Sequence, residues 1–136
     1  MNELIKIEIV TPLELLKSKE TKMSVLPGSE GELGIMSRHT PLMTLLNRGI
    51  IKLINEDNSV SDLIAIDGGV ADVSEEGITV LSERAEVLGS NSSNKQIIDE
   101  KIIALKIKLK KPEFQEDQAL MNEIDFLKFV LEKSNL

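Results

Sequence analysis

The spacing of apolar residues changes once along this chain, near residue 90. Before that point apolar and polar residues alternate in short runs, most regularly between residues 4 and 10. Alternation with a period of two is typical of β-strands that bury one face. After that point apolar residues recur at steps of three and four, the spacing that gives a helix one apolar side. The chain is therefore expected to contain a β domain followed by a helical domain.

Several more alternating runs predict that the β domain is built from antiparallel strands. Turn-forming residues separate these runs, as at Pro27-Gly28 and Gly68-Gly69. Short strands at such spacing are typical of an antiparallel sandwich or barrel. The further runs lie around Met23 and Val25 and at residues 49–54, 62–66 and 78–81.

A polar stretch, GSNSSN at residues 89–94, separates the two patterns and predicts a linker. It sets the boundaries of a β-sandwich domain at residues 1–88 and of a helical domain at residues 95–136. Within the helical domain, two runs repeat the same steps of four, three and four, and Pro112 lies between them. The stripes consist of Ile98, Ile102, Leu105 and Leu109, and of Leu120, Ile124, Leu127 and Leu131. Matching stripes predict an antiparallel two-helix hairpin.

Composition excludes several kinds of function. The net charge of −7 and the near absence of aromatic residues argue against nucleic acid as a partner, because phosphates attract surplus Lys and Arg and unpaired bases stack on rings. With no cysteine and one histidine, the chain offers no thiol nucleophile and no Cys-ligated or multi-His metal site, so neither metal nor cofactor is expected. No apolar run approaches the roughly 18 residues that span a bilayer, so no direct membrane insertion is expected.

Charge is distributed unevenly between the two predicted helices. Residues 95–111 hold six Lys against two acidic residues, and residues 112–136 hold six acidic residues against two Lys. Opposite charges favour contact between the helices, although the same pattern suits solvated outer faces equally well. The sequence leaves both interpretations open.

The stretch GSEGELGIMSRHTPL, residues 28–42, contains the only histidine of the chain. Glu30 or Glu32 beside His39 suggests a general base oriented by a carboxylate. However, no nucleophile and no second histidine accompany them, and the glycines do not form a phosphate-binding loop. A structural or interface role is the favoured interpretation, and we predict no catalytic residue.

The longer stretch LPGSEGELGIMSRHTPLMTLLNRGIIKL, residues 26–53, resembles the signature of the epsilon subunits of the rotary F-type ATP synthase. A second stretch, AIDGGVADVSEEGITVLSERAE at residues 65–86, is similar to the second block of the same family. Ser37 and Thr40 stand where many members carry Pro and Ala. The positions in register are Gly28 through Ile35, His39, Pro41, Leu42, Thr44, Leu46 and Gly49.

The resemblance implies a sandwich of about ten antiparallel strands that joins the gamma subunit to the ring of c subunits in proton-driven ATP synthesis. It implies a non-catalytic rotor subunit of the central stalk, held peripherally at the cytoplasmic face of the bacterial plasma membrane or its organelle equivalent. The stretch around residues 28–42 then becomes a rigid corner that faces partners. Its candidate polar contacts with gamma or the c-ring loops are Glu30, Glu32, Arg38 and His39.

The resemblance also implies a regulatory role for the helical hairpin. In this family the folded hairpin permits rotation, and the hairpin extended along gamma toward the alpha and beta subunits blocks ATP hydrolysis. We expect four lysines at the end of the first helix to contact acidic surface on those catalytic subunits, although lysines there also suit the negative end of a helix. They are Lys106, Lys108, Lys110 and Lys111.

The hairpin departs from the motif through which some members bind ATP, [IL]-D-x-x-R-A. Ile98-Asp99 matches its start, but Ile102 and Ile103 occupy the Arg and Ala positions, and no Arg follows Arg84. Without a guanidinium to hold phosphate, no ATP site is expected. Two alternatives remain open for the whole chain: a β-sandwich adaptor with a partner-binding hairpin, and a nucleotide-sensing module.

Overall fold

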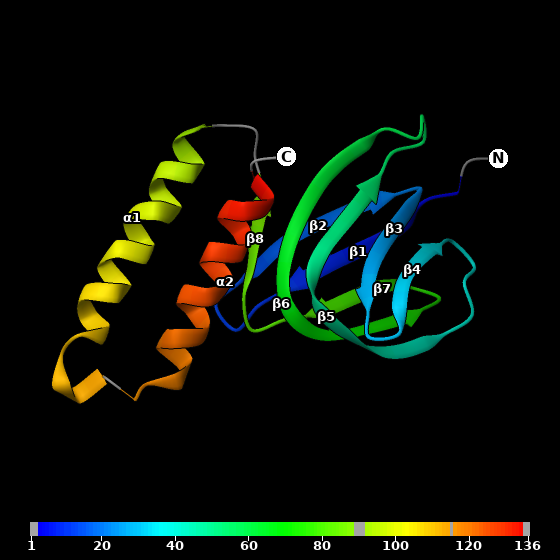
Figure 1. The fold of residues 1–136 in the computed structure, drawn as a ribbon. Helices are drawn as coiled ribbons and strands as arrows, with labels where there is room; N and C mark the ends of the chain where they lie inside the picture. Colours follow the sequence, from blue (N-terminus) through cyan, green and yellow to red (C-terminus); the bar gives the residue numbers. More distant parts are fainter. Residues whose placement is uncertain (1–2, 89–91, 115, 135–136) are drawn as a thin grey trace. The chain divides into compact units, whose positions relative to one another are not determined.

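The computed structural model describes residues 3–88, 92–114 and 116–134, and the chain forms two compact units (Figure 1). The first unit spans Met1–Val87 and consists of strands, and the second spans Leu88–Leu136 and consists of helices. The predicted fold class, a β-sandwich domain followed by two helices, is confirmed. The strands are β1 (Ile5–Val10), β2 (Leu15–Thr21), β3 (Met23–Gly28), β4 (Gly31–Met36), β5 (Leu42–Ile54), β6 (Val60–Ser74), β7 (Gly77–Leu81) and β8 (Ala85–Leu88).

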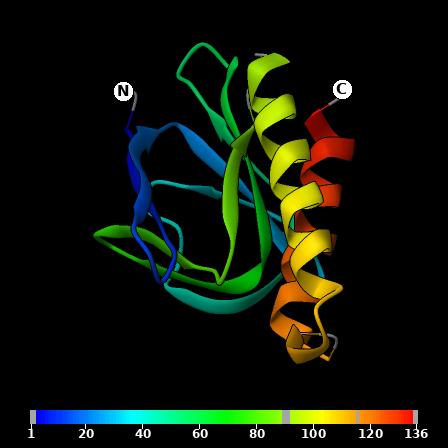
Figure 2. The same ribbon diagram turned by 90° about the vertical axis from the view of Figure 1, so that its left-hand side faces the viewer.

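The strands form one sheet that folds over on itself into two layers. The order is β2-β1-β7-β6-β5-β3-β4, and β8 also pairs with β6. Neighbours are antiparallel except for β1 and β7, which run parallel. The two long strands, β5 and β6, curve strongly, and each contributes to both layers (Figures 1 and 2).

Aliphatic side chains from both layers fill the core of the β-unit. The alternating residues of β1 that pointed to a buried face, Ile5, Ile7 and Ile9, are buried as predicted. No aromatic residue of the chain precedes Phe114, so packing among branched side chains provides the contacts of this core. Its other members include Leu26, Ile35, Ile51, Leu53, Ile64, Ile66, Val73, Ile78 and Val80.

The residues that the structure describes form eight strands, where the resemblance implied about ten. The strands β5 and β6 are long, with 13 and 15 residues, and β6 continues through a bend where a turn was expected. Gly68-Gly69, predicted as a turn, lies inside β6, and both residues have positive φ, 74° and 139°. Glycine adopts such values without a Cβ clash, so the strand bends and keeps its pairing.

A carboxylate on the central strand β6 binds two lysines of β2, an edge strand of the sheet. The Asp62 carboxylate lies 3.1 Å from the ammonium groups of both Lys17 and Lys19, and the Ser61 hydroxyl donates to it at 2.9 Å. Partial burial alone would raise the pKa of Asp62. The hydrogen bonds from Lys17, Lys19 and Ser61 outweigh that effect, and the pKa lies below its ordinary value of 3.8.

Replacing Asp62 with Asn should lower the free energy of unfolding by ~1–2 kcal/mol at pH 7, because both ion pairs are lost. A pKa lowered by folding adds stability above the ordinary value of 3.8, and this contribution disappears as the pH falls through the folded-state value. The difference between wild type and variant should therefore shrink in acid. Urea unfolding at pH 7 and pH 3 measures it, with exposed Asp72→Asn as the control. A constant difference at both pH values would contradict the ion-pair explanation.

The helical unit is an antiparallel hairpin, as predicted. Helix α1 (Ser92–Leu109) and helix α2 (Gln118–Ser134) are joined by a short turn, η1 (Pro112–Phe114). The Asp117 carboxylate accepts a hydrogen bond from the Leu120 N–H at 3.1 Å and caps the start of α2. The expected stripes lie at the helix contact: Ile98, Ile102, Leu120, Ile124 and Leu127 are buried, and Leu105, Leu109 and Leu131 are half-buried.

Two details of the hairpin differ from expectation. Helix α1 begins at Ser92, inside the predicted linker, whose residues 89–91 lie outside the described residues. Ser and Asn suit both a linker and the first turn of a helix, so their composition does not fix that boundary. Phe126 and Val130 are also buried although they lie outside the predicted stripe.

Candidate interaction surfaces

Five apolar residues form a continuous row across five neighbouring strands of the β-unit. The register pairs Leu45 with Val70, Val70 with Leu81, Leu81 with Val10, and Val10 with Leu15. Directly paired residues of adjacent strands project from the same face of a sheet. Because the next residues inward, such as Ile9 and Leu46, are buried in the core, this row lies on the outer face. We call these five residues the apolar row.

The apolar row is solvent-accessible to an unusual degree for aliphatic side chains. Leu45, Leu81 and Leu15 are 64%, 53% and 52% exposed. Single exposed leucines are ordinary, but a contiguous series across a sheet is typical of a surface that another molecule covers. The apolar row is therefore a candidate docking surface, and the sequence pattern did not reveal it.

A shallow groove of about 460 Å³ runs beside the centre of the apolar row. Its walls are mainly apolar, and the carboxylates of Asp67 and Glu83 contribute to its lining. Gly69 lines this groove, and a Cβ at that position would lie 2.1 Å from the Leu81 carbonyl oxygen. The other lining residues are Val10, Thr11, Pro12, Val70, Leu81 and Ser82.

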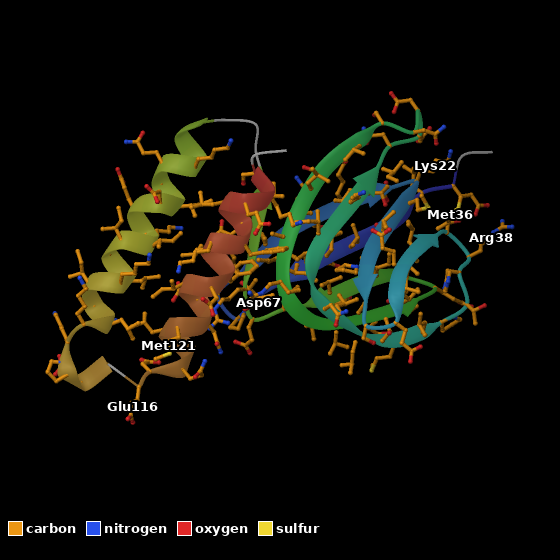
Figure 3. All side chains as sticks on the ribbon, viewed as in Figure 1. Lys22, Met36, Arg38, Asp67, Glu116 and Met121 are labelled. Atoms are coloured by element: carbon orange, nitrogen blue, oxygen red, sulfur yellow. The ribbon has the colours of Figure 1, made fainter. Side chains whose placement is uncertain are left out.

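Asp67 holds the bend of β6 next to this groove (Figure 3). One carboxylate oxygen lies 2.7 Å from Arg48 Nε on β5, and the other lies 3.1 Å from Arg84 Nη1. The Asp67 N–H also donates to the Arg84 carbonyl at 3.0 Å. These contacts join β5, β6 and the segment before β8, so the sheet beside the apolar row is held by several polar contacts.

The four sequence-predicted contact residues of the β-unit lie at opposite ends of β4. Glu30 and Glu32 lie at the turn between β3 and β4 and are exposed. Arg38 and His39 follow the other end of β4, a distance of roughly 20 Å for a strand of this length. The fold therefore keeps Glu30 and Glu32 away from His39. Neither glutamate can orient the histidine as a general base.

Arg38 and His39 instead belong to a polar cluster near the start of the chain. Arg38 adopts φ 66° and pairs with Glu3 at 2.6 Å, and the Ser37 hydroxyl donates to the same carboxylate at 2.7 Å. His39 Nδ1 donates to the Thr40 carbonyl at 2.7 Å. These residues line an open cavity of about 650 Å³, and Figure 3 shows Arg38 at the margin of the β-unit.

The four predicted lysines of the hairpin occupy the last turn of α1 and the residues just after it. Lys106 and Lys108 belong to α1, Lys110 and Lys111 follow it, and all four side chains are exposed. Cationic side chains there complement the negative end of the helix. They also form a local positive surface that can meet a negatively charged partner.

The two positions that depart from the ATP motif both carry aliphatic side chains on α1. Ile102 is buried in the hairpin, and Ile103 lies on an exposed side of α1. Neither side chain offers a hydrogen-bonding atom to phosphate. Within residues 3–88, 92–114 and 116–134, no group of His, Asp and Glu could hold a metal ion, and no helix is long and apolar enough to cross a membrane.

The fold is that of a β-sandwich domain followed by a helical hairpin. The family model described as "ATP synthase, Delta/Epsilon chain, beta-sandwich domain" matches residues 4–87, which cover nearly the whole β-unit. The chain belongs to this family of ATP synthase subunits, as an epsilon chain. The resemblance found in residues 26–53 and 65–86 is thereby confirmed.

Two curated relatives illustrate the similarity. The chain is 43% identical to the ATP synthase epsilon chain of Campylobacter lari over 94 residues, which cover 69% of this chain and 72% of the relative. It is 42% identical to that of Paramagnetospirillum magneticum over 89 residues, which cover 65% of this chain and 66% of the relative.

Solved structures show the same fold at low sequence identity. A chain of the Euglena gracilis mitochondrial ATP synthase, OSCP/F1/c-ring in rotational state 1, has a TM-score of 0.60 at 20% identity. That comparison covers 95% of this chain and 78% of the other. A chain of the Tetrahymena thermophila mitochondrial ATP synthase, central stalk/c-ring, has a TM-score of 0.53 at 12% identity. That comparison covers 98% of this chain and 96% of the other.

Proposed function

We propose that this chain is a non-catalytic rotor subunit of the ATP synthase that couples the gamma subunit to the c-ring. The observation that supports this proposal most directly is the family match over residues 4–87. The subunit performs no chemistry but transmits torque during proton-driven ATP synthesis. It is held at the cytoplasmic face of the bacterial plasma membrane, or the organelle equivalent, through its partners.

The apolar row supports a specific docking site for gamma. Torque transfer needs a contact that does not slip, and a rigid sheet that buries aliphatic side chains against a partner meets that need. Asp67 and its two arginine partners stiffen the sheet beside the row. Arg38 and His39 near Glu3, and Glu30 with Glu32 at the β3–β4 turn, supply polar contacts to gamma or to the c-ring loops.

Recovery of partners from membranes tests this proposal. The tagged full chain is used to capture proteins from solubilised membranes of its native source, and the captured proteins are identified by mass. Gamma, alpha, beta and c subunits are expected. Recovery of the chain without gamma would overturn the rotor proposal and favour a different adaptor role.

The hairpin is proposed to inhibit ATP hydrolysis when it extends along gamma toward the alpha and beta subunits. Such a switch needs two arrangements that differ by only a few kcal/mol. The positive surface at the end of α1, formed by Lys106, Lys108, Lys110 and Lys111, supports contact with acidic side chains in the extended state. Its exposure leaves it accessible to such a partner.

Replacing all four lysines with Gln should raise ATP hydrolysis by the reconstituted enzyme by about fivefold or more, since about 1 kcal/mol of attraction in the inhibited state is lost. The measurement is steady-state hydrolysis at low and physiological ionic strength. The matched control replaces the same four residues with Arg, which keeps the charge and should keep inhibition. Unchanged inhibition in the Gln variant would refute a role for these lysines.

A further inference from the structure

A single thioether stands at the margin of the apolar row. Met43 lies two residues before Leu45 on β5, so the two side chains project from the same outer face. Its cross-strand partner is Asp72, and its side chain is 70% exposed. Met43 is thus a soft, oxidisable group at the edge of a surface that is otherwise aliphatic.

The other sulfur atoms of the described residues are less accessible. Met36 is 48% exposed, and Met23 and Met121 are half-buried, while Met1 lies outside the described residues. The chain has no cysteine that would react first with an oxidant. All three Phe lie in the helical unit, so the sandwich provides no aromatic contact that would stabilise its thioethers.

From this arrangement we propose that Met43 is a site of reversible oxidation by peroxide. The thioether sulfur attacks one peroxide oxygen, the O–O bond breaks, an S–O bond forms, and water leaves as the reduced product. The sulfur loses two electrons and the peroxide gains them. Methionine sulfoxide is returned to the thioether by sulfoxide reductases, so the change is reversible.

Oxidation converts an apolar group into a polar one at the docking surface. This step rests on the proposed function, in which the apolar row and its margin become covered by gamma. The sulfoxide oxygen is a strong acceptor that must lose its water on docking, and no side chain of the apolar row can donate a hydrogen bond to it. Oxidised free subunits therefore bind gamma more weakly, whereas Met43 in the assembled rotor is protected by its partner.

The order of oxidation is measured on the isolated full chain. Increasing doses of hydrogen peroxide are followed by peptide mass mapping, with the Met43→Leu and Met36→Leu variants as matched controls. Met43 is expected to gain its oxygen first, before Met36, Met23 and Met121. Oxidation of Met36 or another methionine at an equal or lower dose would overturn the assignment.

The consequence is measured as affinity for purified gamma, before and after oxidation. We expect the affinity of the wild type to fall by about tenfold or more and to recover after reductase treatment, while Met43→Leu is unaffected. An equal fall in Met43→Leu would overturn the role of Met43. Failure of the unoxidised chain to bind gamma would instead overturn the docking function, and with it the regulation of docking by oxidation. The peptide mass mapping would still decide which methionine is oxidised first.

Discussion

Replacing both Leu45 and Leu81 with Glu is expected to weaken binding to gamma by at least ~100-fold while the chain still folds. Both side chains are largely exposed, so the folded chain loses little when they become polar. In the proposed complex with gamma, each leucine would contribute burial worth ~1.5–3 kcal/mol, and each glutamate would in addition have to be desolvated. Affinity and stability should therefore respond very differently.

The measurement is a binding titration of the full chain against purified gamma, together with thermal unfolding. The matched control places two glutamates at exposed apolar positions of the other layer, Met36 and Val60, which the register joins through Met23 and Ile54. This control should bind like the wild type. Normal binding by the Leu45/Leu81 variant would remove the apolar row from the interface, and equal loss in the control would point to a general effect of charge.

The hairpin and the inner face of the sheet could be predicted because their patterns are local. A stripe such as Leu120, Ile124 and Leu127 follows from helical geometry alone, and these residues are buried as expected. The inward residues of β1 followed in the same way from strand geometry. Where a strand or helix buries one face within its own domain, the spacing of its apolar residues predicts which side chains are buried.

The apolar row could not be predicted from the sequence, because a register cannot be read from one strand at a time. Each residue of the apolar row stands next to an inward-facing apolar residue. Two adjacent apolar residues interrupt the alternation, so the pattern does not show where the strand ends. These doublets are Ile9-Val10, Leu15-Leu16, Leu45-Leu46, Val70-Ala71 and Val80-Leu81. One outward-facing apolar residue on a single strand is ordinary. The five residues form a row only when the five strands pair in this register.

The polar contacts of the predicted corner were beyond the sequence for a related reason. Arg38 pairs with Glu3, 35 positions earlier, and the two meet only because the fold brings β4 close to the start of the chain. The motif suggested instead that Glu30 and Glu32 share a site with His39. An extended strand between them keeps them apart, so closeness in sequence was misleading there.

Replacing Gly69 with Ala is expected to destabilise the chain by ~3–5 kcal/mol. Gly69 has φ 139°, which strains any residue with a Cβ, and the added atom would also lie 2.1 Å from the Leu81 carbonyl oxygen. That oxygen belongs to the backbone of the neighbouring strand, so it cannot move without disturbing the pairing of Val70 with Leu81. The clash is therefore expected to separate β6 from β7 at Val70 and Leu81, in the middle of the apolar row.

Gly31 provides the matched control, because its φ of 129° is similar and an added Cβ would meet nothing within 4 Å. Gly31→Ala should cost only the backbone strain, ~1 kcal/mol or somewhat more. The chain lacks Trp and Tyr, so unfolding is followed by far-ultraviolet circular dichroism in urea. Equal destabilisation by the two variants would mean that the Leu81 backbone yields easily. A much larger loss at Gly69, together with lost binding to gamma, would tie the rigidity of this bend to the docking surface.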